Sequence, residues 1–482
     1  MTTWNSQRRD TVFSMHKKRL SVSVLLLLAV EIINKVFPLY IIHYVQKKLG
    51  VESFGYAQFG ISVIEMSIPF IVFGYSNYGS IELGRYKDQY EKSRRLISSI
   101  FMLKLIHACL VFIFLTGLFS AVPSYEPYRS LILILSFVLF FSSLDSLWVQ
   151  VGVQKVAIFS FFNGAAKLIS FLLIISTVSS PDDAVLYTVF TLMANALICV
   201  FTGIYSLRMF PLLMPKKKDL WTVFKASRVY AVIVVMMVFF ERIDLIIVEK
   251  MFGIKGVGLY SGPLRLIHSA NQLISAAALP FFSEVVAITD KDSLAKHTRY
   301  AVFVLMLVLA PSVAGIWFVD QHILELIFSS EYAQMNRVLS FLMAGMLCLA
   351  MILVFGHNIL LIRNAQSKMI ISLALGGATA IILAFQLGEQ WQYEGIAASM
   401  FLGKLVTALM TAYFAKKYIS YFPWADFFKT GLAGGIMATV LWLASPGDFL
   451  ITLLIGALTY SLLILLIYFK EIGFLWQRFK NR

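Results

Sequence analysis

The stretch YAVIVVMMVFFERIDLIIVEKMFGIKGVGLYSGPLRLIHSANQLISAAALPFFSEVV, residues 230–286, decides the fold. Two long apolar runs flank a glycine-rich turn at residues 252–258. The ionisable residues inside the two runs include Glu241, Arg242, Asp244, Arg265 and His268. A charged side chain at the centre of a membrane span costs about 2.5–3.5 kcal/mol. These charges therefore predict that the hairpin faces a polar cavity inside a membrane protein.

The composition of the whole chain supports the membrane class. Hydrophobic residues make up 59% of the 482 residues, charged residues make up 14%, and the mean hydropathy is +0.80. A soluble domain has about 25% charged residues. The formal net charge of +15 fits a nucleic-acid-binding protein as well. Because the basic residues lie in short loops between apolar segments, we interpret them as determinants of membrane orientation instead.

Fourteen apolar segments are long enough to be candidate spans, since a span needs about 20 apolar residues. They lie near residues 20–45, 55–78, 97–121, 130–152, 157–178, 185–207, 229–248, 259–286, 300–319, 337–362, 369–387, 394–415, 428–444 and 449–469. The sequence thus predicts an all-α polytopic membrane protein with about 14 transmembrane helices. The first segment lacks a small-residue cleavage site, so we expect a retained helix and not a signal peptide.

Lys and Arg are distributed unequally between the loops on the two sides of the predicted spans. One set of loops, together with the N-terminus and the C-terminal tail, holds most of them. The positive-inside rule places that set and both termini in the cytoplasm. We therefore expect a multi-pass membrane protein with both termini in the cytoplasm. The tail at residues 473–480 mixes aromatic and basic residues, which is typical of an interfacial anchor.

An internal repeat follows the first and the seventh predicted spans. Residues 50–56 read GVESFGY and residues 253–260 read GIKGVGLY. Glycines permit the positive φ of a tight turn, although short glycine turns also recur by chance. The equivalent positions of the two copies predict two six-helix bundles in the same orientation around a central cavity. The predicted domains are residues 1–207, a cytoplasmic linker at 208–228, a second bundle at 229–415, and a helix pair with a basic tail at 416–482.

Ionisable residues recur throughout the predicted spans. A shared hydrated cavity explains them more economically than lipid exposure, and excess cations there would favour a phosphate or diphosphate group. The candidate substrate-binding cations are Lys35, Lys104, Lys167, Arg242, Arg265 and Lys404. The candidates for ion or proton coupling are Glu31, Glu65, Asp145, Glu241 and Asp244. The alternative is that these groups form buried ion pairs that hold helices together.

Motifs for catalysis or metal binding are missing from the sequence. It has no phosphate-binding loop of the Walker type, no HExxH, no paired CxxC and no nucleophile elbow. Cys109, Cys199 and Cys348 all lie in apolar segments and offer no disulfide framework. We therefore expect no cofactor, no metal and no enzymatic activity, and a transport step driven by a gradient, by substrate supply or by a partner.

Several short motifs carry a resemblance to a known family. They are Asn34-Lys35, residues 49–56 (LGVESFGY), residues 73–80 (FGYSNYGS), residues 148–152 (WVQVG), Asp244, Phe252-Gly253, residues 257–260 (VGLY) and residues 278–280 (ALP). The chain resembles the polysaccharide-transporter branch, with the Wzx or O-antigen flippases, of the multidrug/oligosaccharidyl-lipid/polysaccharide exporter superfamily. The resemblance covers nearly the whole chain. After the second helix it departs from the Gly-Phe-Asn-Leu-Ser frequent among O-antigen flippases, because this chain has GYSNY at residues 74–78.

The resemblance implies a function. It implies a V-shaped pair of six-helix bundles that moves an undecaprenyl-diphosphate-linked oligosaccharide by alternating access. The movement it implies is from the cytoplasmic to the periplasmic leaflet of a bacterial inner membrane. Lys35, Arg242 and Arg265 match, by location, the membrane cations that meet the diphosphate or acidic sugars in that family, whereas the remaining cations are nominated by charge alone. A polysaccharide polymerase and a chain-length regulator are implied as partners. The departure after helix two leaves O-antigen, capsule, exopolysaccharide, common-antigen and teichuronic-type cargo open.

Three other functions compete with this one. A drug or small-solute antiporter of the same superfamily is disfavoured because a cationic cavity repels cationic drugs. A polytopic polysaccharide polymerase or ligase would be expected to carry a large periplasmic loop, and the longest predicted one, residues 320–336, is short. A structural scaffold for a polysaccharide assembly complex would not need so many intramembrane charges.

Overall fold

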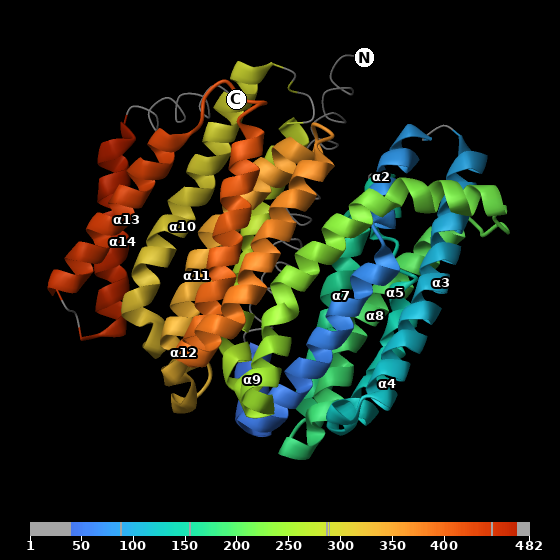
Figure 1. The fold of residues 1–482 in the computed structure, drawn as a ribbon, viewed down its shortest axis with the longest axis horizontal. Coiled ribbons are helices and arrows are strands. Elements are labelled where there is room, and N and C mark those ends of the chain that lie inside the picture. Colours follow the sequence, from blue (N-terminus) through green and yellow to red (C-terminus); the bar gives the residue numbers. More distant parts are fainter. Residues whose placement is uncertain are drawn as a thin grey trace, which may run out of the picture. The chain divides into compact units, whose positions relative to one another are not determined.

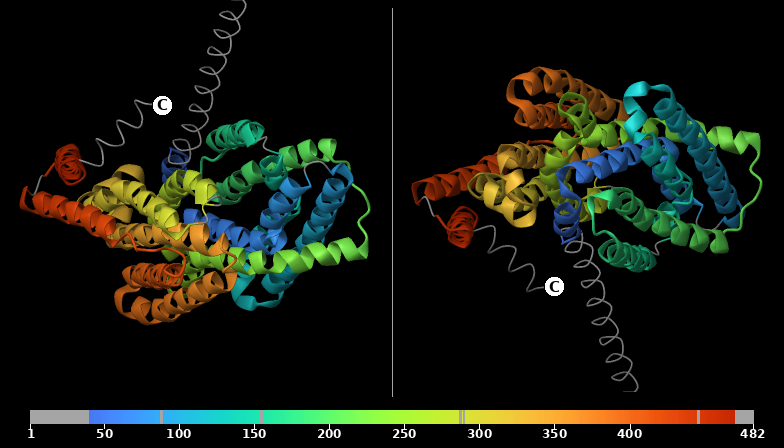
Figure 2. Two further views of the ribbon diagram at one scale, coloured as in Figure 1. Left: turned by 90° about the horizontal axis from the view of Figure 1, so that it is seen from above. Right: turned by 90° about the horizontal axis from the view of Figure 1, so that it is seen from below.

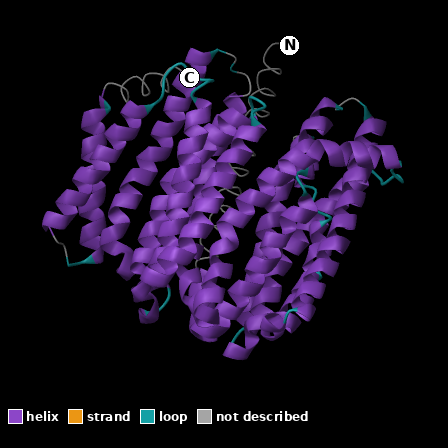
Figure 3. Cartoon of the chain, viewed as in Figure 1, coloured by secondary structure: helices purple, strands orange, loops and turns teal. Residues whose placement is uncertain are grey.

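The structure is a computed structural model that describes residues 40–86, 89–153, 156–285, 288, 290–444 and 447–469. Within those ranges every regular element is helical (Figure 3). The predictions for Glu31 and Lys35 lie outside the described residues. In the described part of the chain, nine segments are long and apolar enough to cross a membrane by length and composition. The predicted class of multi-pass helical membrane protein is confirmed, and the count of fourteen helices stays a prediction.

The chain divides into two compact units (Figure 1). Unit 1 comprises residues 1–50 and 63–231, and unit 2 comprises residues 51–62 and 232–482. After a helical segment at residues 40–72, the helices of unit 1 are α2 (Tyr75–Arg85), α3 (Tyr90–Ala121), α4 (Arg129–Ser136), α5 (Val138–Ser142), α6 (Leu147–Gly152), α7 (Val156–Thr177) and α8 (Ala184–Met209). α9 (Lys217–Val285) begins in unit 1 and continues into unit 2. The predicted domain boundaries at 207, 228 and 415 stay predictions.

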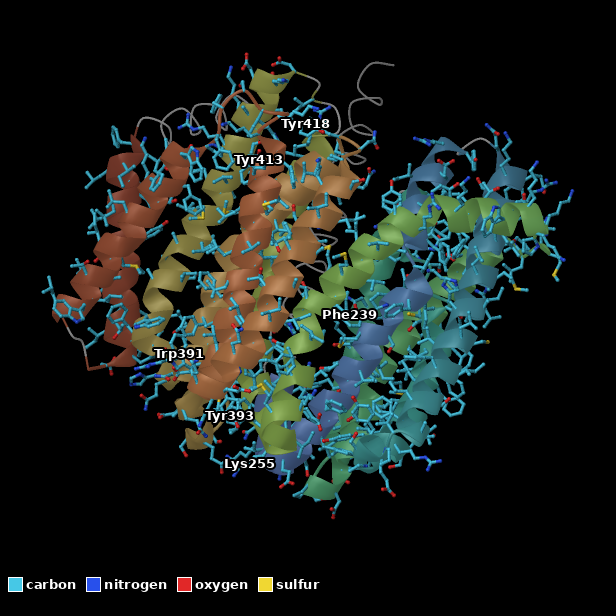
Figure 4. All side chains as sticks on the ribbon, in the orientation of Figure 1. Phe239, Lys255, Trp391, Tyr393, Tyr413 and Tyr418 are labelled. Atoms are coloured by element: carbon cyan, nitrogen blue, oxygen red, sulfur yellow. The ribbon has the colours of Figure 1, made fainter. Side chains whose placement is uncertain are left out.

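The remaining helices belong to unit 2. They are α10 (Lys291–Ile327), α11 (Asn336–Met351) with a π-helical continuation (Ile352–Leu361), α12 (Gln366–Ala415), α13 (Trp424–Ala444) and α14 (Phe449–Ile467). The 50-residue α12 is two helices joined at Trp391 and Gln392, whose backbone is non-helical. Figure 4 shows Trp391 and Tyr393 at the same end of unit 2 as Lys255, whereas Tyr413 and Tyr418 lie toward the other end of α12. The break therefore reverses the chain direction between the two halves of α12.

The two copies of the internal repeat adopt the same unusual backbone. Gly50 has φ 71° and Gly253 has φ 67°, which is the left-handed region that favours glycine. At Gly253 ψ is −171°, a combination that is almost restricted to glycine. Each of these residues therefore interrupts an otherwise helical segment at the turn that the sequence predicts.

Five residues after the positive-φ glycine of each copy, the two copies cross each other within unit 2. A Cβ added to Gly55 would lie 2.2 Å from the carbonyl oxygen of Ile254. A Cβ added to Gly258 would lie 2.0 Å from the carbonyl oxygen of Val51. Since Val51 and Ile254 both directly follow the positive-φ glycine of their copy, the two contacts are equivalent. The repeat is therefore also a packing device, in which small residues let two helix backbones meet.

Unit 1 is organised around the motif at residues 73–80. Gly74, with φ 68°, precedes α2 and leaves no room for a Cβ beside Tyr230. A Cβ on Gly79 would lie 2.6 Å from the indole ring of Trp148 in α6. Tyr75 and Trp148 belong to one buried apolar cluster with residues of α3. The motifs at residues 73–80 and 148–152, which are far apart in the sequence, thus contribute to one apolar core of unit 1.

The C-terminal helices α13 and α14 pack against α10 at one edge of unit 2 (Figures 1 and 2). The Arg299 guanidinium donates to both carboxylate oxygens of the buried Asp426, at 2.5 Å from Nε and 3.2 Å from Nη2. Tyr468, just after α14, donates its hydroxyl proton to the same carboxylate at 3.2 Å. The helix pair is therefore held to unit 2 by a polar contact in addition to apolar packing.

Candidate functional site: buried charges in the two units

Lys104 of α3 is a buried cation that unit 1 neutralises internally. Its side chain is fully buried, and its Nζ donates to the backbone carbonyl of Asp145 at 2.7 Å. The same ammonium lies 3.5 Å from Oδ2 of the Asp145 carboxylate. The pair ties α3 to the turn that precedes α6. Both groups are therefore engaged with each other in this conformation, and their predicted roles in substrate binding and ion coupling stay predictions.

The structure describes two further candidates in unit 1. Lys167 of α7 and Glu65 of the segment 40–72 are both half-buried. Each of them interacts with other groups of the protein. Their predicted roles in substrate binding and ion coupling stay predictions.

Unit 2 contains a buried carboxylate, Asp244 of α9, that is 3% exposed. Its Oδ1 accepts the backbone N–H of Leu245 at 2.9 Å. Lys404 of α12 and Arg242 of α9 both interact electrostatically with this carboxylate, Lys404 more strongly. The Tyr260 hydroxyl is buried near the same group. Asp244 therefore has cations on two helices for neighbours.

Small residues bring α12 close enough to α9 for this arrangement. A Cβ on Gly403 would lie 3.1 Å from the Phe240 ring of α9 and 2.6 Å from the carbonyl oxygen of Gly376. A Cβ on Gly345 of α11 would lie 3.3 Å from Cδ of Lys404. The half-buried side chain of Lys404 thus lies against α11, in space that a residue larger than glycine at position 345 would occupy.

A second group of polar residues comes from the part of α9 after Gly253. Nε and Nη2 of Arg265 donate to Oε1 of Gln58, at 2.9 and 2.6 Å. His268, nearly one turn later, interacts with the backbone carbonyl of Glu241. Its ring also interacts electrostatically with Arg242, Arg265 and Lys404. The structure therefore brings together residues that the sequence distributes over four apolar segments.

We name these residues the unit 2 cluster: Arg242, Asp244, Arg265, His268 and Lys404. It holds three basic side chains, one histidine and one carboxylate. Glu241 contributes its backbone carbonyl, and the predicted role of its carboxylate in coupling stays a prediction. Half-buried basic side chains gathered in one place favour an anionic ligand, because that ligand compensates the cost of bringing the like charges together and partly removing them from water.

The sequence analysis did not identify two residues that contact the unit 2 cluster. Gln58 anchors Arg265, and Tyr260 lies near Asp244. Tyr260 is the last residue of the second glycine motif and Gln58 lies two residues after the first, so the repeat itself was the available signal. Within the described residues no group of three or more His, Cys, Asp or Glu side chains is arranged to hold a metal ion.

The profile of a family described as polysaccharide biosynthesis protein matches residues 21–286, more than half of the chain. The chain belongs to this family. A second profile, described as lipid II flippase MurJ, matches residues 257–477. Both families are of the flippase and transporter type, and neither is a family of catalytic enzymes. A comparison with curated protein sequences gave no match.

Solved structures share the fold over most of the chain. A lipid II flippase MurJ in an inward closed conformation aligns with a TM-score of 0.76 at 17% identity, covering 93% of this chain and 100% of the other. An inward-facing multidrug resistance transporter of the MATE family aligns with a TM-score of 0.60 at 14% identity, covering 80% and 94%. The eukaryotic MATE transporter AtDTX14 aligns with a TM-score of 0.56 at 16% identity, covering 88% of this chain and 99% of the other. The predicted superfamily fold is thereby confirmed.

Proposed function

We propose that this protein is a flippase that moves an undecaprenyl-diphosphate-linked oligosaccharide from the cytoplasmic to the periplasmic leaflet of a bacterial inner membrane by alternating access. The cargo would be the repeat unit of an O-antigen, a capsule or an exopolysaccharide. The family of polysaccharide biosynthesis proteins and the fold similarity to a lipid II flippase support this class of cargo. A central cavity between two bundles, a polysaccharide polymerase and a chain-length regulator as partners, and cytoplasmic termini belong to the same proposal.

The observation that carries the proposal is the gathering of three basic side chains near the buried Asp244 and His268 in the unit 2 cluster. A diphosphate offers several acceptor oxygens and negative charge, which Arg binds with its planar fork and Lys binds as a point charge. Arg242 and Lys404 are the members we expect to meet the anion first. Arg265 already donates twice to Gln58, so its contribution requires that this contact be shared or released.

Replacement of single cations tests this function in cells. We expect Arg242→Ala and Lys404→Met to abolish most surface polysaccharide at matched protein level, and Arg242→Lys and Lys404→Arg to restore part of it. The double variant Lys104→Met/Asp145→Asn is the matched control, because it removes a buried cation together with its own counter-charge. Normal polysaccharide in both neutral unit 2 variants would remove these residues from the substrate path.

A drug or small-solute antiporter of the same fold is the second candidate. The fold similarity to MATE transporters is the observation in its favour. A strain that lacks the gene for this chain distinguishes the two, because loss of an antiporter would change the minimal inhibitory concentration of cationic drugs and leave surface polysaccharide intact. The positive charge of the unit 2 cluster predicts the opposite result.

A further inference from the structure

The connection between α8 and α9 presents an exposed surface that the proposed transport step does not use. Residues 210–216 form an irregular segment, and α9 then begins at Lys217. In Figure 1 the first part of α9 crosses the ends of α2 and α3, which belong to the same unit. This placement puts the connection on the surface of unit 1.

The connection between α8 and α9 is held against α3 by hydrogen bonds and by one aromatic contact. Arg94 Nε donates to the carbonyl oxygen of Pro211 at 2.6 Å, and Leu213 N donates to the Ser98 hydroxyl at 2.9 Å. The ring of Phe210 stacks on that of Tyr90 with 5.5 Å between centroids. α3 therefore holds the segment in one position, and its outward side chains form a defined surface.

Apolar side chains nevertheless point away from the protein here. Leu212 is 52% exposed, Met214 is 86% exposed and Trp221 is 65% exposed. Exposed apolar side chains this large mark an interaction site when they are gathered in one place. The chain bends so that Leu213, between Leu212 and Met214, is the one that is half-buried.

The first turns of α9 have one buried face and one basic face. Leu220, Val223 and Phe224 pack on the apolar core of unit 1. The exposed face carries cations on both sides of Trp221, namely Lys217, Lys218, Lys225 and Arg228, and Lys216 is exposed directly before the helix. None of these cations has an ion-pair partner among the described residues.

The exposed face changes character along α9. After Arg228 the exposed positions are Val229 and Val232, at 37% and 43% exposure, so charge gives way to apolar side chains. This order, from basic residues with a Trp to aliphatic residues, is typical of a helix that passes from the headgroup level into hydrocarbon. This order favours a position of the cations near the depth of lipid phosphates.

We propose that residues 212–228, the linker surface, form a docking site for anionic phospholipid headgroups. Leu212, Met214 and Trp221 insert among the acyl chains nearest the headgroups, and the unpaired lysines bind lipid phosphates. Charge complementarity selects this occupant, since an anionic membrane surface attracts clustered Lys and Arg. The site fixes the end of unit 1 on the membrane surface at the point where α9 begins. The proposal is independent of the transported cargo.

The test uses the full-length protein in lipid nanodiscs with a reporter at position 214. Cys109, Cys199 and Cys348 are replaced by Ala, Met214→Cys is labelled with an environment-sensitive fluorophore, and the discs contain phosphatidylcholine with or without phosphatidylglycerol. We expect blue-shifted emission that shallow nitroxide lipids quench, more strongly with phosphatidylglycerol. Because each Lys near an anionic surface changes binding about fivefold, Lys216→Glu/Lys217→Glu/Lys218→Glu should reduce the phosphatidylglycerol preference at least about tenfold.

The control variant carries the same charge change at exposed lysines outside the linker surface, Lys47→Glu/Lys48→Glu/Lys255→Glu. It should leave the emission at position 214 unchanged. Equal emission in both disc types would overturn the selectivity for anionic headgroups. Emission typical of water in discs, combined with a shielded reporter in native membranes, would overturn the proposal in favour of a protein partner. Loss of the signal on addition of inorganic phosphate would overturn the role of the bilayer and indicate a site for the free anion.

Discussion

Lys104 in unit 1 and Lys404 in unit 2 are both lysines of apolar helices, yet their surroundings differ in charge. Lys104 is fully buried and has a carboxylate and a carbonyl of the same residue as partners. Lys404 is half-buried, and it shares the single carboxylate of its cluster with Arg242. We expect a buried cation with its own counter-charge to hold helices together, and basic side chains gathered around one carboxylate to accept a further anion. The comparison leads us to expect that the charges surrounding a buried cation, and not burial alone, separate packing from binding.

The strongest test of this contrast removes surplus charge from unit 2. Arg242→Ala combined with Lys404→Met should lower the rate of surface polysaccharide assembly at least about tenfold, since a hydrogen bond to a charged group contributes roughly 1.5–3 kcal/mol. The measurement is incorporation of labelled sugar into surface polymer at matched protein level. An unchanged rate would mean that the surplus charge serves packing in unit 2 as well.

Breaking the pair in unit 1 should damage stability instead. Lys104→Met leaves the Asp145 carboxylate next to an apolar side chain. Because the side chain of Asp145 is 28% exposed, we expect a cost below the roughly 3–5 kcal/mol of a fully buried pair. The detergent-solubilised variant should therefore unfold at a clearly lower temperature. Lys104→Met/Asp145→Asn should recover most of the loss, because no unpaired charge remains. If the double variant were as unstable as the single one, the pair would not be the reason for the burial of Lys104.

The glycine crossing in unit 2 gives a smaller and purely steric effect. Gly258→Ala places a Cβ where the Val51 carbonyl oxygen is 2.0 Å away, so the two backbones must separate. Overpacking of this kind costs about 1–3 kcal/mol. Gly84→Ala in α2 is the matched control, because a Cβ there has no neighbour within 4 Å. The measurement is the midpoint temperature of thermal unfolding of both variants. Equal midpoints would contradict the close contact between Gly258 and the Val51 carbonyl.

The attachment of the C-terminal helix pair should give the smallest change. The side chain of Arg299 is 42% exposed and that of Asp426 is 2% exposed, so Arg299→Ala leaves a buried carboxylate with the Tyr468 hydroxyl. Because the Tyr468 hydroxyl remains as a partner of the carboxylate, we expect a loss of about 1–3 kcal/mol, the cost of one poorly satisfied buried group. Limited proteolysis between α12 and α13 should become faster, and Lys291→Ala, an exposed residue at the start of α10, should have no such effect.

The sequence predicted the helical membrane class, the superfamily fold and the turn at each glycine motif. Hydropathy and charge are local properties, and they are sufficient for those conclusions. The sequence did not reveal that Gly55 and Gly258 pack on each other's copy, or that Gln58 binds Arg265, because both contacts join segments about 200 residues apart. The difference between Lys104 and Lys404 was also hidden, since it depends on which helices small residues allow to meet. The roles of Lys35 and Glu31 stay predictions.

Binding of undecaprenyl diphosphate to the purified protein tests the central claim most directly. Isothermal titration in detergent or nanodiscs would compare the wild-type protein, Arg242→Ala/Lys404→Met and Lys104→Met/Asp145→Asn. The account predicts that the unit 2 variant loses at least about tenfold in affinity, roughly 1.4 kcal/mol, while the unit 1 variant binds as the wild-type protein does. Equal affinities for all three proteins, or a loss confined to the unit 1 variant, would contradict it.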